Sequence, residues 1–501
     1  MMFTWEFPPR IIGGLSTHVY HLSRSLDRKG VDVQLITCDF PNATPQEING
    51  GIRVSRVNSS GIVERDFMLW IYYMNSLMIS KATEILNKES FDIIHAHDWM
   101  VARAALEIKN LYNIPLVTTI HATEIGRNRG INFYHDYQKT IHNLENLLIC
   151  HSERIICCSN YMLRHIETNF GISTNLVSII PNGVDTLLFH PTPNLRKSVF
   201  NLRQQHCIQN GKMLLYVGRL VREKGCDILI DAFKTLNHDT PGTSLIIVGE
   251  GPLKQSLMNK VHQLGLQNHI HFMGFVDQQT LVAAYKSADV LVIPSLYEPF
   301  GIVALEGMAS GAPVVSSDVG GLSEVVENGF TGLKVTPGDR DSLVSAIRQV
   351  LEVPSLSRFL KRNGYEYILK RYNWDLVAEK TVDIYMQALS QQILGKTSRE
   401  KAQIPPVVIA DEDFFVTDRM LLRLLLTLGI TNEESSKTAQ EISASITGVS
   451  EELVKLILGR LASHGYISTL IVHTRINGDL AVDVRYHLTE NGIISACSDY
   501  S

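Results

Sequence analysis

Residues 295–315, SLYEPFGIVALEGMASGAPVV, join the end of a buried-type strand, a tight turn and a helix rich in small residues. Glu298 follows the strand, and the helix begins near Gly301. Free N–H groups at such a helix start favour bound phosphate. Glu306 lies inside this apolar helix, where a carboxylate is costly without a partner and is able to accept hydrogen bonds from paired sugar hydroxyls. The stretch predicts a ligand site, with a plain core helix as the alternative.

Short β-branched segments alternate with helical stretches on both sides of this site. The earlier series contains VDVQLIT, FDIIHAH, PLVTTIHA and RIICCS. The later series, from Met213, contains MLLYVGR, SLIIVGEG, HIHFMGF, DVLVIPS, APVVSSD and TGLKVT. Apolar strands separated by helices indicate parallel sheets covered on both faces. We therefore predict an α/β protein with two doubly wound, Rossmann-like domains, residues 1–190 and 191–395.

The C-terminal part has a different pattern. The segment GKTSREKAQIPP predicts a linker, placed at residues 396–411. Residues 412–501 then give two amphipathic helices around a Gly-Val-Ser turn, followed by two strands around Asn477-Gly478-Asp479. Helix, turn, helix and β-hairpin is typical of a winged helix.

Composition limits the classes of function. The 501 residues are 45% hydrophobic and 19% charged with a net charge of -5, which indicates a globular protein without general attraction to nucleic acid or anionic membranes. An anionic ligand must therefore be held by local groups. Seven scattered cysteines and the absence of a secretory signal predict a cytoplasmic protein with reduced thiols. The first strand begins almost at Met1, so a natural start upstream stays open.

The most apolar stretch is FMLWIYYMNSLMI, from Phe67 to Ile79. Asn75 and Ser76 interrupt it, and it is shorter than the ~20 apolar residues of a membrane span. We interpret it as a core or groove-lining helix, with seating on a membrane as the alternative.

Two loops after predicted strands carry groups suited to a diphosphate. Gly13 and Gly14 lie between the opening strand and a helix, where glycine permits close backbone approach, although a simple turn is the alternative. Arg219 and Lys224, in YVGRLVREKG, follow a strand of the second series. Ligands of doubly wound domains bind beyond the carboxyl ends of the strands, so these cations are candidates to neutralise a leaving diphosphate. Charges of a solvated loop are the alternative.

Histidines and an aspartate follow strands of the first domain. His95, His97 and Asp98 lie in IIHAHDW, and His121 lies in TTIHATEIGRNRG. No third ligand at metal spacing follows the His pair, so we predict no metal site there. His95 is interpreted as a core histidine.

Taken together, these segments resemble a known family. The Gly-Gly turn, TTIHATE, YVGRLVREKG, VGEGP, EPFGIVALEGMASGAPVV and VGGLSEVVENGFTGL are similar to retaining glycosyltransferases of family 4, which have the GT-B fold of two facing Rossmann-like domains. The likeness runs to about Leu389. WEFPPRIIGGL, IIHAHDW and TIHATEIGRNRG resemble the glycogen or starch synthase side of that superfamily.

The resemblance implies roles for individual residues. The implied catalytic residues are His121 near the reacting carbon, Arg219 and Lys224 on the phosphates, and Glu298 on the transferred sugar. Donor contacts are implied for Gly13, Gly14, Gly218, Gly249, Gly301, Ile302, Val303 and Glu306, the last holding ribose hydroxyls. Asp98 is implied on the acceptor side. No cofactor or metal is implied, and no Asp-x-Asp occurs in a position to hold one.

The expected reaction moves a hexose, with glucose as the best guess, from a UDP- or ADP-sugar to a hydroxyl of an α-glucan. Starch synthases usually have Lys where this chain has Ile11 and Gln where it has Glu306, which puts ADP-glucose in doubt. A lipid or small-molecule acceptor is one alternative. A regulator whose larger part senses a sugar nucleotide and which acts on DNA through the winged helix is another.

The predicted winged helix carries the wrong charge for DNA. Residues 402–501 contain 13 Asp and Glu against 7 Lys and Arg, and Glu451 and Glu452 open the helix that would enter the groove. Phosphate binding requires positive charge. We therefore expect this domain to bind a protein partner or another subunit, and not DNA.

Overall fold

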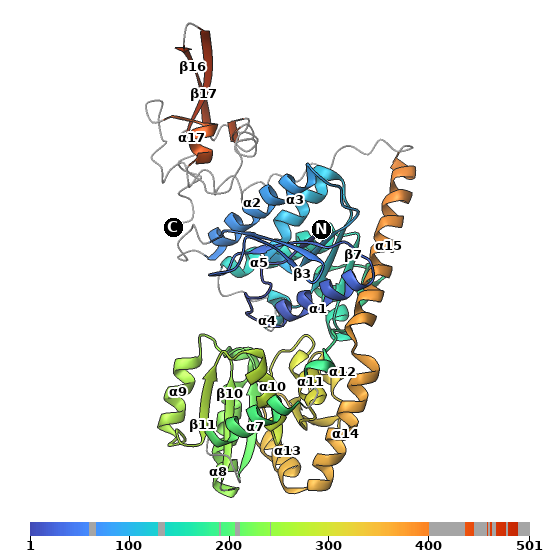
Figure 1. Ribbon diagram of the computed structural model, residues 1–501, viewed down its shortest axis with the longest axis vertical. Coiled ribbons are helices and arrows are strands. Elements are labelled where there is room, and N and C mark those ends of the chain that lie inside the picture. Colours follow the sequence, from blue (N-terminus) through green and yellow to red (C-terminus); the bar gives the residue numbers. More distant parts are fainter. Residues whose placement is uncertain are drawn as a thin grey trace. The chain divides into compact units, whose positions relative to one another are not determined.

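The computed structural model describes residues 1–59, 67–128, 136–189, 192–205, 211–240, 242–399, 436–444, 458, 461–462, 467–476 and 479–488. Within them, strands and helices alternate along the chain as the sequence predicts (Figure 1). Two large sheets and a small one result. The α/β class predicted from the sequence is confirmed.

The first large sheet has eight strands in the order β3-β4-β2-β1-β5-β6-β7-β8. The strands are β1 (Met2–Phe3), β2 (Gln34–Cys38), β3 (Gln46–Asn49), β4 (Ile52–Val57), β5 (Ile94–His97), β6 (Leu116–Ile120), β7 (Arg154–Cys157) and β8 (Val177–Ile179). β1 pairs in parallel with both β2 and β5, and Met2 lies opposite Leu35 and His95. Because the strand order reverses between β1 and β5, their carboxyl ends flank a topological switch point.

Helices connect these strands. They are α1 (Gly14–Arg28), α2 (Phe67–Leu86), α3 (Ala102–Tyr112), α4 (Glu124–Arg127), α5 (Asp136–Cys150) and α6 (Asn160–Phe170), with short turns η1 (Trp99–Val101), η2 (Thr174–Leu176) and η3 (Thr186–Phe189). α2 contains the apolar stretch that the sequence singled out, and it buries Ile71, Met74 and Met78. Asn75 inside it donates to the Met100 carbonyl at 2.8 Å and accepts from the Ala104 N–H at 2.9 Å. The stretch is therefore a core helix.

The second large sheet is parallel, in the order β11-β10-β9-β12-β13-β14. Its strands are β9 (Lys212–Val217), β10 (Thr243–Val248), β11 (Ile270–Gly274), β12 (Val290–Ile293), β13 (Val314–Ser317) and β14 (Gly332–Val335). β10, β12 and β13 are buried along their whole length, as expected for strands covered on both faces. Here the strand order reverses between β9 and β12.

The helices that accompany this sheet supply the rest of its core. They are α7 (Pro193–Gln205), η4 (Arg222–Lys224), α8 (Cys226–Asp239), α9 (Lys254–Gln263), α10 (Gln278–Ser287), α11 (Ile302–Ser310), α12 (Leu322–Val325), α13 (Arg340–Glu352) and α14 (Pro354–Arg371). Leu229 and Phe233 of α8 and Ile347 of α13 are fully buried together with Leu214 and Leu245 of the sheet. This packing fixes the loops that leave the carboxyl ends of β9 and β12.

Contacts divide the chain into two compact units. Unit 1 comprises residues 1–10, 33–117 and 388–501, and unit 2 comprises residues 11–32 and 118–387. The boundary predicted between residues 190 and 191 falls inside unit 2 and stays a prediction. In the part of the chain that the structure describes, no helix is long and apolar enough to cross a membrane.

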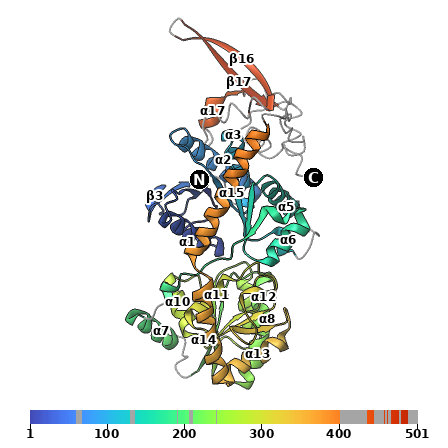
Figure 2. The ribbon, with the colours of Figure 1, turned by 90° about the vertical axis from the view of Figure 1, so that its right-hand side faces the viewer.

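The C-terminal region is described only in part. α15 (Trp374–Arg399; Figure 2) continues through the first four residues of the predicted linker. The predicted hairpin is confirmed: β16 (Ile467–Ile476) and β17 (Asp479–Leu488) pair antiparallel, and β15 (Lys437–Thr438), which precedes α17 (Ala439–Ala444), pairs with β17. Glu451, Glu452 and the Asn477-Gly478 turn lie outside the described residues, so the winged helix stays a prediction.

Candidate functional site

The loops after β9 and β12 meet at the switch point of the second sheet. The Glu223 carbonyl in η4 accepts a hydrogen bond from the Leu296 N–H at 2.8 Å, which ties the two loops together. Gly225, directly after η4, has φ +65°, and a Cβ there would lie 2.1 Å from the Pro294 carbonyl oxygen. Only glycine permits this approach. The chain thus holds the predicted cationic loop against the predicted Glu298 loop.

Lys224 and Glu298 form an ion pair at this junction. Lys224 Nζ lies 2.6 Å from Glu298 Oε2, with side chains 21% and 12% exposed. The Ser295 hydroxyl donates to the same carboxylate oxygen at 3.3 Å. Charges in such a partly desolvated position interact more strongly than on an open surface. The structure therefore brings together two residues, 74 positions apart in sequence, that were predicted to act on one substrate.

Arg219, the second predicted cation, lies on the same loop. Its Nη2 atom is 3.4 Å from Glu223 Oε1, and its side chain is 44% exposed. An exposed ion pair of this kind contributes little to stability, so the guanidinium can reorient at low cost. Its role on the donor phosphates stays a prediction.

Two predicted glycines allow the loops after β9 and β10 to touch. Gly249 has φ +137°, and a Cβ on it would lie 2.0 Å from the Gly218 carbonyl oxygen. The Gly218 N–H donates to the Val248 carbonyl at 3.0 Å. A side chain at position 249 would push the loop of Arg219 away, so this glycine keeps that loop in place.

The start of α11 lies close to the start of α1. Gly301, the residue before α11, has φ +107°. A Cβ on Gly14, the first residue of α1, would lie 3.0 Å from Ile302 Cδ1, whereas one on Gly13 would meet nothing within 4 Å. Ile302 and Val303, the first residues of α11, are half-buried. Two helix starts, each with N–H groups that lack intrahelical partners, thus approach one another, which is a favourable place for a diphosphate.

Glu306 lies one turn into α11 and has a partner that the sequence did not reveal. The hydroxyl of Tyr285, a fully buried residue of α10, donates to Glu306 Oε2 at 2.6 Å. Burial raises the pKa of the Glu306 carboxyl to about 7, and the Tyr285 hydrogen bond opposes that rise. The cost of a carboxylate in an apolar helix is thereby reduced.

His121 belongs to a group of aromatic side chains in unit 2. Its ring centroid lies 4.5 Å from that of His18 on α1, and His18 Nδ1 is 2.6 Å from Asn182 Oδ1. The ring of Trp374 lies 5.5 Å from His18 and stacks on His21. Burial lowers the pKa of His121 to about 3, so the imidazole is neutral at physiological pH.

Asp98 lies in unit 1, immediately after β5. It is buried and has φ 61° and ψ 174°, a region of backbone conformation that is occupied almost only by glycine. Non-glycine residues persist there only when their surroundings fix them, and they concentrate at functional sites. The role of Asp98 on the acceptor side stays a prediction.

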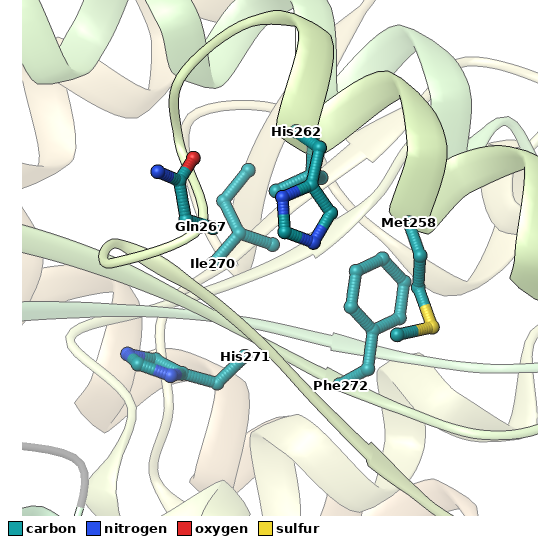
Figure 3. Close-up of a pocket in the computed structure, with 7 residues that line it drawn as sticks. Met258, His262, Gln267, Ile270, His271 and Phe272 are labelled. Atoms are coloured by element: carbon teal, nitrogen blue, oxygen red, sulfur yellow. The ribbon is translucent and has the colours of Figure 1, made fainter.

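A separate shallow hollow of about 290 Å³ lies between α9 and β11 and includes none of the predicted residues. Figure 3 shows His262 and Met258 above Phe272 and His271 in this hollow.

Tyr285, Ser295, His18 and Asn182 were missed by the sequence analysis. Tyr285 and Asn182 lie 21 and 164 residues from their partners, so no local spacing connects them. His18 lies one helical turn after Gly14, which was the one available signal.

Comparisons with known proteins define the class. Residues 199–367 match the family described as glycosyl transferases group 1, and residues 12–187 match glycosyltransferase family 4. A glycosyltransferase of Methanocaldococcus jannaschii is 37% identical over 396 residues, which is 79% of this chain and 99% of the relative. The chain belongs to the family 4 type of glycosyltransferases.

Two more comparisons refine the setting. The glycogen synthase of Mycobacterium tuberculosis is 35% identical over 402 residues, 77% of this chain and 94% of the relative. The structure of sucrose-phosphate synthase from Thermosynechococcus elongatus is similar with a TM-score of 0.68 at 24% identity, over 78% of this chain and 98% of that one. The GT-B fold predicted from the sequence is thereby confirmed.

Proposed function

We propose that the chain is a retaining hexosyltransferase that moves glucose from a nucleotide-diphosphate sugar to a hydroxyl of an α-glucan. One observation carries the proposal: the half-buried Lys224–Glu298 pair, 2.6 Å apart, lies at the β9/β12 switch point. The similarity to a glycogen synthase over 94% of that relative supports glucan as acceptor and glucose as the transferred sugar.

In the proposed reaction the bond between the anomeric carbon and the diphosphate oxygen breaks. Negative charge grows on that oxygen, where Lys224, Arg219 and the N–H groups of Ile302 and Val303 stabilise it. Lysine has three donors, so Lys224 can hold a phosphate oxygen and keep Glu298 in place. The acceptor oxygen bonds to the same face of the anomeric carbon, and its proton passes to the departing phosphate oxygen.

Two further residues lie beside the anomeric carbon, where positive charge develops. Glu298 contacts the transferred sugar as a carboxylate. His121 lies near the reacting carbon, and because its pKa is lowered to about 3 it adds no positive charge there. A neutral imidazole is able to hydrogen-bond a sugar hydroxyl without repelling the developing oxocarbenium ion.

The donor diphosphate is proposed to lie between the starts of α1 and α11, with Gly13, Gly14, Gly218, Gly249 and Gly301 providing close backbone approach. Glu306 would hold the ribose hydroxyls. UDP-glucose is favoured over ADP-glucose, because Ile11 and Glu306 depart from the starch synthase pattern.

A lipid is the second candidate for the acceptor, and its main support was the apolar stretch from Phe67 to Ile79. Ile71, Met74 and Met78 of that stretch are buried in the core, and Phe67 at its start is 48% exposed.

A panel of UDP-, ADP- and GDP-sugars tests the proposal. With glycogen present, we expect nucleotide release from one glucose donor and slow or no release without acceptor. Release that needs no glycogen but follows a lipid acceptor would favour the second candidate, and no release from any donor would contradict the proposal.

A further inference from the structure

Four aromatic side chains form a cluster in unit 1 at the switch point of the first sheet. Trp5 follows β1 by two residues, and Trp99 is the second residue after β5. Phe67 and Trp70 come from the first turn of α2. The ring centroids are 6.3 Å apart for Trp5 and Trp70, 6.2 Å for Phe67 and Trp70, and 6.2 Å for Phe67 and Trp99. The cluster therefore joins three segments that are far apart in sequence.

A guanidinium lies against the same rings. Arg10 Cζ is 5.6 Å from the ring centroids of both Trp5 and Trp70, within cation–π range. Its Nη1 donates to the Asp39 carbonyl at 3.0 Å. These contacts set the orientation of the two indoles and place hydrogen-bond donors beside their faces.

Much of this cluster is accessible. Phe67 is 48% exposed and Trp5 and Trp70 are half-buried, whereas Trp99 is buried beneath them. Ile71, Met74 and Met78 of α2 are buried, whereas the rings of Phe67 and Trp70 stay accessible in its first turn. Flat rings suit a rigid, flat ligand better than a lipid tail.

The adjoining residue makes the position chemically specific. Asp98, in its strained conformation, immediately precedes Trp99 at the end of β5. Doubly wound domains bind ligands at the switch point beyond the strand ends, and here that point is flanked by Trp5 and Asp98. A pyranose ring presents faces of C–H bonds that stack on the electron-rich face of an aromatic ring, and its hydroxyls need polar partners. Arg10 places donors beside the two indoles, and Asp98 is the residue before Trp99.

We propose that Trp5, Phe67, Trp70 and Arg10, supported by the buried Trp99, form a binding platform for the glucose units of an α-glucan acceptor. This platform rests on the proposed function and deepens it, because it assigns the residues that recognise the acceptor chain. Glucose suits stacking on both sides, since all its ring substituents other than the anomeric one are equatorial.

Tryptophan fluorescence measures binding to the platform without any transfer. Three of the four tryptophans of the chain belong to the cluster, and Trp374 is the fourth. We expect maltoheptaose, titrated into the full chain without donor, to change the emission saturably. Phe67→Ala keeps every tryptophan and should weaken the affinity roughly three- to tenfold, as expected for the loss of one stacking ring.

Phe359→Ala is the matched control. Phe359 is also 48% exposed and its ring lies 6.0 Å from that of Phe330, but it belongs to α14. It should leave maltoheptaose affinity unchanged. Trp70→Phe, which retains an aromatic ring, should bind better than Trp70→Ala if stacking is the cause. Unchanged far-ultraviolet circular dichroism and cooperative thermal melting show that the variants fold.

The outcomes separate this proposal from the proposed function. If wild type transfers glucose to glycogen but Phe67→Ala and Trp70→Ala bind maltoheptaose as wild type does, the platform is wrong and the function stands. If maltoheptaose binds to the platform but no nucleotide-sugar is used, the function is wrong and the platform stands. A fluorescence change with phosphatidylcholine vesicles and none with maltoheptaose would overturn the platform in favour of a lipid.

Discussion

Among single residues, Lys224 is the one on which the proposed reaction depends most. Lys224→Ala removes the positive charge beside the leaving diphosphate, and the expected loss in kcat is about 10²- to 10³-fold, as for one group that stabilises charge in a transition state. Lys260→Ala is a matched control, because Lys260 Nζ also pairs with a carboxylate, Asp231 Oδ2, at 2.7 Å. Steady-state kinetics and thermal melts compare the two. Activity of Lys224→Ala within a few-fold of wild type, or an equal loss in the control, would refute the assignment.

Glu306 predicts a pH dependence. Its pKa of about 7 means that the carboxylate needed to accept ribose hydroxyl hydrogen bonds is lost as the pH falls below 7. The donor KM should therefore rise as the pH falls through that value. His121 and His18 do not share this window, because burial lowers the pKa of each.

Tyr285→Phe tests the predicted titration of Glu306 through its hydrogen-bond partner. The Tyr285 hydrogen bond favours the charged form of Glu306, so its loss should move the midpoint of the KM profile to higher pH and raise the donor KM about three- to tenfold at neutral pH. Acceptor KM should stay unchanged. An unshifted profile would exclude Tyr285 as the residue that positions Glu306.

We expect the transfer reaction to need no divalent metal ion to neutralise the donor diphosphate. Because Lys224, Arg219 and helix N–H groups are proposed to neutralise the diphosphate, EDTA should leave transfer intact. Transfer assays before and after chelation measure this. Activity lost with EDTA and restored by Mn²⁺ or Mg²⁺ would show that a metal is required.

At the scale of elements, the loop between β12 and α11 has to keep its shape. Gly320, which lies between β13 and α12, packs against this loop. It has φ +54°, and a Cβ there would lie 2.1 Å from the Glu298 carbonyl oxygen. Gly311 has φ +77°, and a Cβ there would meet nothing within 4 Å. Backbone strain should cost each alanine variant about 1 kcal/mol of unfolding free energy, and the contact with the Glu298 carbonyl should add to that cost in Gly320→Ala. Only Gly320→Ala should also lose most of its turnover, because it displaces Glu298; equal turnover in both variants would contradict this.

The same elements show how far sequence reasoning reaches. Strands and helices follow from local apolar patterns, so the alternation and the loops of Gly14, Lys224 and Glu298 were placed correctly. The Lys224–Glu298 pair itself depends on the β9–β12 pairing, which no local pattern states. Tyr285 and Asn182 have no motif of their own, and their roles arise only from packing. The ring cluster around Trp5 likewise requires three separate segments to fold together.

At the scale of the whole molecule, the C-terminal region is expected to be dispensable for chemistry. The family matches end at residue 367, and all predicted site residues precede it. A chain truncated after Ser398 should keep some transferase activity. Complete loss of activity in a folded truncation would make the C-terminal region part of the enzyme.

The fragment from Ile404 to Ser501 is expected to fold alone. Because its net charge is negative, it should bind duplex DNA no more tightly than a neutral control. Gel-shift assays at several salt concentrations measure this. A salt-sensitive shift at low micromolar fragment would contradict it.

A radiolabelled sugar shows whether the chain transfers glucose to glycogen. The purified chain is incubated with glycogen and UDP-glucose or ADP-glucose carrying ¹⁴C in the sugar, and the label in precipitated glycogen is counted before and after digestion with an α-1,4-specific amylase. We predict label in glycogen from one of these donors, released by the α-specific enzyme because configuration is retained, and absent with Lys224→Ala. Label that stays in free glucose, or that enters glycogen and resists the α-specific enzyme, would contradict the account.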